Sequence, residues 1–139
     1  MQSSAHPSDP GTEPRGRVLV VEDDPEAALF VVYALEKRGR FSVTHTANPL
    51  EALALAASEP WDLALTDLDL PVISGAELIA ALRRVAPGLP VILVTAHDRD
   101  DFPGGASKPD RLLVKPVSAE RLLAAAVTLV GGSTPAPED

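Results

Sequence analysis

The stretch LALTDLDLPVISG, residues 63 to 75, decides the fold and raises the question of function. It begins as an apolar run, ends in two aspartates one residue apart, Asp67 and Asp69, and then breaks at a proline and a glycine. A buried strand that ends in carboxylates places them where a metal ion, a phosphoryl group or water can meet them. The elements on either side determine which of the three applies.

Strand-like and helix-like segments alternate on both sides of this stretch. Short apolar runs rich in Val, Leu and Ile are expected strands, the first of them ending in acids: 17–24, 41–46, 62–67, 90–96 and 111–115. Segments with helical patterns follow them: 25–39, 48–59, 75–88 and 118–130. Asp24, Asn48 and Ser118 are expected N-caps. The alternation predicts a doubly wound α/β domain with a five-stranded parallel sheet and helices on both faces.

Residues 97–110, between the last two strands, lie where a fourth helix is expected but cannot form one of normal length. This segment contains Pro103, Gly104, Gly105 and Pro109. A proline inside a helix costs about 3 kcal/mol, and each glycine adds roughly 1 kcal/mol. We therefore expect a shortened or missing fourth helix and otherwise a mobile loop.

Composition restricts the class of protein. The chain has 139 residues, 45% of them hydrophobic and 4% aromatic, which suits a single domain with an aliphatic core. A formal net charge of -8 argues against direct binding of nucleic acid or an anionic membrane. There is no cysteine, and no apolar stretch reaches the length of a membrane span or forms a signal sequence. A cytoplasmic location is the default expectation.

Both ends of the chain are rich in Ser, Pro, Gly and acidic residues. Such composition is typical of tails that do not join a core. We expect disordered tails at 1–16 and 131–139 and one folded domain at 17–130.

The residues capable of chemistry all follow or end expected strands: Glu22, Asp23, Asp67, Thr95 and Lys115. In a parallel sheet with strand order 2-1-3-4-5, the carboxyl ends of the first, third and fourth strands are neighbours at one edge. Three carboxylates gathered there repel one another unless a cation neutralises them, and oxygen ligands without His or Cys suit Mg²⁺. The central Asp67 is the expected nucleophile toward phosphorus, with Thr95 and Lys115 stabilising the remaining charge.

These motifs, in this order, resemble the receiver domain of bacterial two-component response regulators over residues 17–130. The motifs are VVEDD, TDLDLPVISG, the threonine of VTA and the lysine of VKP. The resemblance implies the flavodoxin-like strand order and a signalling domain rather than a conventional enzyme, with at most slow self-catalysed phosphorylation and dephosphorylation.

The resemblance also implies roles for single residues. Asp67 would accept a phosphoryl group from a histidine kinase or a histidine phosphotransfer protein. The side chains of Glu22, Asp23 and Asp67 and the backbone carbonyl of Asp69 would surround Mg²⁺. A cis peptide bond would join Lys115 to Pro116.

The sequence departs from the common receiver pattern in two further places. The first acidic pair is Glu22–Asp23 rather than Asp-Asp, which lengthens one arm. Leu112 stands where receivers often carry Tyr or Phe, which removes the usual aromatic partner of the threonine.

Two alternatives remain open at this point. The DLDL motif also resembles the first motif of haloacid-dehalogenase-type phosphatases. Those enzymes carry this motif on their first strand, whereas here an acidic pair on an earlier strand precedes it. The second alternative is a pseudo-receiver, which keeps the fold for binding alone. The complete set of acids, Thr95 and Lys115 argues against this alternative. Any single acid at a strand end is more often a cap or a solvated loop residue.

The first helix carries a separate signal. Residues 27–35 are apolar at nine successive positions, whereas a helix on one face of a sheet needs only an apolar stripe. We expect part of this surface to be exposed, at Leu29, Val32 or Tyr33. Docking of a helical phosphodonor, or of a second copy as a homodimer, would cover it.

Overall fold

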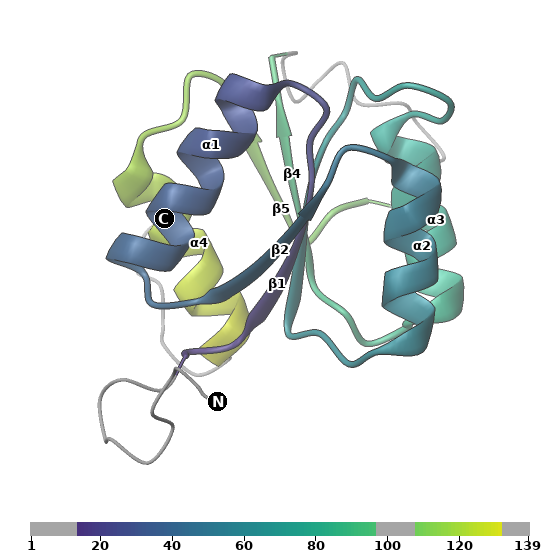
Figure 1. The fold of residues 1–139 in the computed structure, drawn as a ribbon, viewed down its shortest axis with the longest axis horizontal. Helices are drawn as coiled ribbons and strands as arrows, with labels where there is room; N and C mark the ends of the chain where they lie inside the picture. The colour runs from purple at the N-terminus through teal and green to yellow at the C-terminus, as the bar shows by residue number, and fades with distance from the viewer. Residues whose placement is uncertain (1–13, 97–107, 132–139) are drawn as a thin grey trace, which may run out of the picture.

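The computed structural model describes residues 14–96 and 108–131. Its strands and helices alternate along the chain (Figure 1). The strands are β1 (Arg17–Val21), β2 (Ser42–Thr46), β3 (Leu63–Asp67), β4 (Val91–Thr95) and β5 (Arg111–Val114). The helices are α1 (Pro25–Tyr33), the π-helical turn η1 (Ala34–Arg38), α2 (Pro49–Ser58), α3 (Gly75–Val85) and α4 (Ala119–Gly131).

The five strands form one parallel sheet in the order β2-β1-β3-β4-β5, as expected from the sequence. α1 and α4 lie on one side of the sheet, and α2 and α3 lie on the other (Figure 1). The chain therefore has the doubly wound, flavodoxin-like α/β fold.

Two apolar clusters fill the space between the sheet and its helices. One joins Val20 and Leu65 to Val31, Leu35 and Leu122 on the side of α1 and α4. The second cluster lies under α2 and α3 and contains strand residues of the opposite faces, such as Leu19, Ala64 and Leu93. Every residue of β3 and β4 is buried, so these central strands leave room for exposed chemistry only at their ends.

Local capping interactions begin the helices where the sequence predicts. The Asp24 side chain accepts a hydrogen bond from the backbone N–H of Ala27 at 3.2 Å, and the Ser118 hydroxyl accepts one from Arg121 at 3.1 Å. The Asn48 side chain likewise accepts from the N–H of Leu50 at 2.9 Å. α3 has a reciprocal capping box between Ser74 and Glu77, which we did not predict.

The first helix differs from the sequence-based expectation in two respects. It continues after Tyr33 as a π-helical turn instead of an α-helix, and the N–H of Gly39 donates to the carbonyl of Ala34 five residues earlier at 3.0 Å. Its exposed apolar residues include Leu29 and Tyr33, as predicted, but the third is Phe30, while Val32 is half-buried. The prediction of exposed apolar surface is therefore confirmed at Leu29 and Tyr33, whereas Val32, the third candidate, is only partly exposed.

The turn between β3 and α3 contains a conformation that few residues of its type adopt. Val72 has φ of 71°, in the left-handed region. A β-branched side chain is disfavoured there because its Cβ approaches the backbone, at a cost of roughly 1–2 kcal/mol. The turn that follows Asp67 therefore holds Val72 in a backbone conformation that valine disfavours.

Several expectations concern segments outside the described residues. The expected fourth helix or loop spans residues 97–110, of which 97–107 lie outside the described residues, and most of the two expected tails fall at 1–13 and 132–139. Within the described part, no helix is long and apolar enough to cross a membrane.

Candidate functional site

The carboxyl edge of the sheet gathers the predicted residues. Glu22 and Asp23 follow β1, Asp67 is the last residue of β3, Thr95 is the last residue of β4, and Lys115 follows β5. Since β1 and β4 both pair with β3, Asp67 occupies the middle of this edge. The sequence-based placement of these residues is consistent with the sheet.

Three of the acids lie close enough together to share a cation. One carboxylate oxygen from each of Glu22, Asp23 and Asp67 lies within 4.8 Å of the others. Glu22 and Asp67 are buried, whereas Asp23 is exposed. A half-buried group of hard oxygen donors, without His or Cys, has the chemistry that Mg²⁺ prefers.

Backbone groups hold two of these carboxylates in position. The N–H of Asp24 donates to Glu22 Oε2 at 3.1 Å, and the N–H of Leu68 donates to Asp67 Oδ1 at 2.8 Å. Each bond comes from a residue one or two positions later in the chain, so the turn after each strand orients the strand's own carboxylate. The acids are therefore directed by local geometry as well as by the sheet.

His45 is a site-supporting residue that sequence reasoning missed. Its ring Nε2 lies 2.8 Å from the backbone carbonyl oxygen of Glu22. A carbonyl can only accept, so this contact requires the proton on Nε2. The register that pairs His45 with Val20 indicates a neighbour of Glu22, but only once the pairing of β1 with β2 is known.

The Lys115 ammonium, at the end of β5, faces the Asp67 carboxylate at the end of β3. Its Nζ lies 3.6 Å from Asp67 Oδ2. The backbone N–H of Lys115 donates to the carbonyl of Thr95 at 2.7 Å, which ties the end of β5 to the end of β4. The peptide bond between Lys115 and Pro116 is cis, as the resemblance implied.

Burial governs the ionisation of the two inner acids. Removal from water raises the pKa of Asp67 above its ordinary value of 3.8, although Lys115 and the backbone bond from Leu68 act in the opposite direction. Burial likewise raises the pKa of Glu22, with the neighbouring charge of Asp67 adding to the effect. The metal-free site therefore favours uptake of protons, as expected of a site short of positive charge.

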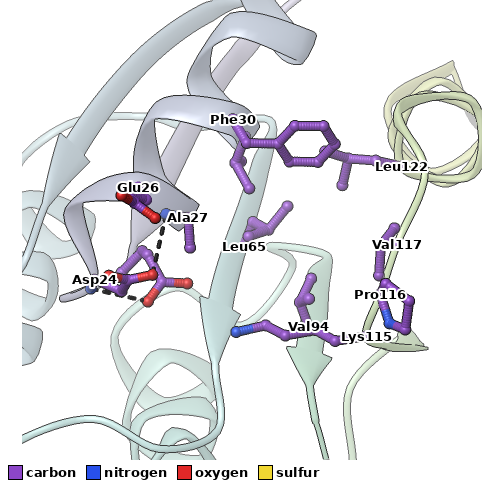
Figure 2. A pocket seen from close by; sticks show the side chains of 12 residues that line it. Asp24, Glu26, Ala27, Phe30, Leu65, Val94, Lys115, Pro116, Val117 and Leu122 are labelled. Carbon is purple, nitrogen blue, oxygen red and sulfur yellow. Dashed lines mark hydrogen bonds between the residues drawn. The ribbon is translucent and has the colours of Figure 1, made fainter.

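A cavity of about 520 Å³ opens beside the acidic cluster, between α1 and the segment that follows β5. Figure 2 shows Lys115 extending toward the start of α1, while Phe30 and Leu122 point toward each other across the cavity. The charged residues of the wall are Glu22, Asp24, Glu26 and Lys115, and its other lining residues are apolar. The site is thus reached from the side of α1 and the loop at Pro116.

Gly75 allows the start of α3 to approach the end of β3. Its N–H donates to the carbonyl of Leu68 at 2.7 Å. A Cβ at this position would lie 2.3 Å from the carbonyl oxygen of Asp67 and 2.7 Å from the Cα of Leu68. Because both are backbone atoms, no side-chain rotation relieves the overlap.

Two predicted positions are less closely involved. Asp69 is exposed and does not join the three-carboxylate cluster, so any contribution to a metal would come from its backbone. Leu112 is half-buried and packs against the apolar cluster under α2 and α3. An aliphatic residue that packs in the core therefore occupies the position where receivers often carry Tyr or Phe.

Comparison with known proteins gives a consistent family. The model of the response regulator receiver domain matches residues 18–127. The chain is 38% identical to the response regulator receiver protein Anae109_2439 of Anaeromyxobacter over 77% of this chain and 45% of that protein. It is 36% identical to the response regulator receiver protein CpdR of Brucella abortus, over 68% of this chain and 73% of CpdR.

A solved structure agrees with the sequence matches. The response regulator TrrA from Thermotoga maritima, in complex with Mg²⁺ and BeF, superposes with a TM-score of 0.72 at 30% identity, covering 81% of this chain and 97% of TrrA. Most of the curated relatives are longer, and the chain spans about half the length of the first four matched.

The close approach at Gly75 predicts a position-specific cost for a single methyl group. Gly75→Ala should lower the free energy of unfolding by about 1–3 kcal/mol or more, because its Cβ overlaps the backbone of Asp67. Gly88→Ala is the matched control, since no atom lies within 4 Å of its Cβ position. Urea unfolding of both variants measures the difference, and equal stability would contradict the close approach.

The raised pKa values predict how stability depends on pH without metal. The folded state holds protons on Asp67 and Glu22 more tightly than the unfolded chain. Their contribution is therefore fully present below the ordinary values of 3.8 and 4.5 and is lost as the pH rises through the raised pKa values. Asp67→Asn should flatten this decline and be more stable than the parent at neutral pH.

Chelator-treated protein, unfolded in urea across the acid-to-neutral range, gives the measurement. Glu120→Gln is the contrasting control because the pKa of Glu120 is lowered, by a backbone hydrogen bond and by Arg38. Its loss should therefore reduce stability slightly at neutral pH. An Asp67→Asn variant less stable than the parent at neutral pH would show that the ionised carboxylate favours the fold.

Proposed function

The chain belongs to the receiver-domain family of two-component response regulators, and from that premise we propose that Asp67 accepts a phosphoryl group in a magnesium-dependent reaction. The donor is a histidine kinase or a histidine phosphotransfer protein. The observation that carries the proposal is the position of Asp67, with acidic neighbours on one side and Lys115 at 3.6 Å on the other. A nucleophilic carboxylate between a cation-binding group and an ammonium fits phosphoryl transfer.

The step itself is a displacement at phosphorus. A carboxylate oxygen of Asp67 forms a bond to phosphorus as the bond from phosphorus to the donor's imidazole nitrogen breaks. The electron pair of that bond returns to the imidazole, so the products are an aspartyl phosphate and a free histidine. Little covalent chemistry is asked of the protein, and positioning with charge stabilisation supplies the rate.

Magnesium fits the acidic cluster on the chemistry of its donors. The carboxylates of Glu22, Asp23 and Asp67 would hold the ion, together with the backbone carbonyl of Asp69. When bound, the ion supplies positive charge to the phosphoryl oxygens and offsets the repulsion among the carboxylates. The longer side chain of Glu22 is oriented for this role by the N–H of Asp24.

Thr95 and Lys115 complete the site on the side opposite the acidic pair. Both belong to strand ends that are tied together by the backbone bond from Lys115 to Thr95. We assign the Lys115 ammonium to a phosphoryl oxygen, as it already lies beside Asp67. The buried Thr95 hydroxyl is assigned to another phosphoryl oxygen.

The phosphatase alternative is not favoured by the fold. Asp67 lies on β3 in the centre of the sheet, whereas that class of enzyme would want its paired aspartates on the first strand. A binding-only receiver is separated from the proposal by the experiment below.

Replacing the acceptor tests the assignment directly. Asp67→Asn should abolish labelling from a phosphorylated histidine donor, because an amide oxygen is a poor nucleophile. Asp69→Asn is the matched control, since it keeps the backbone carbonyl and should still be labelled. Acid-labile phosphate on the protein is the measurement, and a chelator should remove it from the parent. Undiminished labelling of Asp67→Asn would exclude Asp67 as the acceptor, and an unlabelled parent across a donor panel would favour a binding-only domain.

Metal binding is tested by thermal unfolding. Magnesium at about ten times its dissociation constant should stabilise the folded state by about 1.4 kcal/mol and raise Tm by several degrees. Asp23→Asn should reduce this rise because it removes the exposed carboxylate of the cluster. Asp69→Asn should respond like the parent. If Asp23→Asn responds to Mg²⁺ as strongly as the parent, Asp23 is not a ligand.

A further inference from the structure

The outer face of α1 carries an apolar surface that nothing in the described structure covers. Leu29 is 72% exposed, Tyr33 is 60% exposed and Phe30 is 44% exposed. They lie at positions i, i+1 and i+4, and Glu26 precedes them by one turn. These residues together with Lys37 are called the α1 stripe below.

The π-helical turn extends the stripe by one basic residue. In η1 the hydrogen bond from Gly39 to Ala34 spans five residues, so each turn holds more residues than in an α-helix. A residue four positions after Tyr33 lies close to the same face here, as it would in an α-helix. Lys37 is exposed and ends the stripe on the side opposite Glu26.

The charges at the two ends make the stripe complementary to itself. Glu26 is acidic, Lys37 is basic, and the residues between them are apolar. Within residues 14–96 and 108–131, neither Glu26 nor Lys37 has a side-chain ion pair. If two copies of the helix meet antiparallel about a twofold axis, each Glu26 faces the Lys37 of the other copy, and the apolar centres meet.

We propose that the α1 stripe binds a second copy of this chain in an antiparallel, twofold-symmetric arrangement. A hollow of about 460 Å³ lies on the stripe, lined by Glu26, Leu29, Phe30 and Tyr33. An apolar side chain from the second copy fills this hollow, and symmetry requires the reciprocal contact. Opposite charges at the two ends fix the antiparallel direction, because a parallel pair would set like charges against each other.

The size of the stripe sets the strength of the association. One helix face buries less than the roughly 800 Å² per partner of a standard interface. The dimer is therefore weak and depends on protein concentration. The inference rests on the surface of α1 and η1 and does not require that Asp67 be phosphorylated.

Sedimentation velocity over a concentration series measures the association. The parent should move from monomer toward dimer as concentration rises, and Leu29→Glu should weaken dimerisation at least tenfold. Leu50→Glu is the matched control, because Leu50 is also an exposed leucine, 52% exposed, on α2. Thermal unfolding of each variant establishes that the fold is retained.

The charged ends allow a sharper test. Glu26→Lys and Lys37→Glu should each weaken self-association, since each sets like charges together at both ends of the pair. Mixing the two variants should restore it, because both end contacts in the mixed pair are then between opposite charges. Arg84→Glu, which makes the same change of charge at an exposed position of α3, should leave association unchanged.

Three results would overturn the proposal. The first is a parent protein that stays monomeric over the whole concentration range. The second is a dimer that the α1 variants do not weaken, or one that mixing Glu26→Lys with Lys37→Glu does not restore. The third is loss of phosphotransfer in Leu29→Glu without any self-association of the parent, which would assign the stripe to the phosphodonor.

Discussion

Burial of the parallel sheet on both faces is the constraint on which the rest of the molecule depends. Every residue of β3 and β4 is buried, and helices cover both sides of the sheet. Charged side chains can emerge only where the strands end, and in a parallel sheet those ends meet at one edge. Glu22, Asp67 and Lys115 are far apart in the sequence, and the strand order of the sheet brings them together.

The carboxyl edge of the sheet contains several features that lower the stability of the folded state. Burial raises the pKa of both Asp67 and Glu22, which means that their ionised forms oppose folding at neutral pH. The turn after Asp67 adds the left-handed Val72, and α3 approaches so closely that only Gly75 fits. Unfavourable charge and backbone conformation at one place are typical of a site that a ligand completes.

Much of the fold could be predicted because its signals are local. Asp24, Asn48 and Ser118 cap helices through bonds to residues two or three positions away, and the alternation of strands and helices leaves few topologies. The carboxylates could be predicted for the same reason, since each ends or follows a strand. The role of His45 could not, because it depends on the register between β1 and β2, which are separated by a helix. The π-helical turn and the exposure of Phe30 instead of Val32 likewise depend on how α1 packs. Nine successive apolar residues have no polar positions between them, so their pattern does not show which side of the helix faces the core.

The position of α1 links its outer surface to the acidic edge. The helix begins at Pro25, after its N-cap Asp24, and its inner face packs on the core through Ala28 and Val31. A second copy on the stripe and a donor that approaches beside α1 would compete for space, and by linkage each would weaken the binding of the other by the same factor. The extent of self-association would then set how much of the protein is open to phosphorylation at a given concentration.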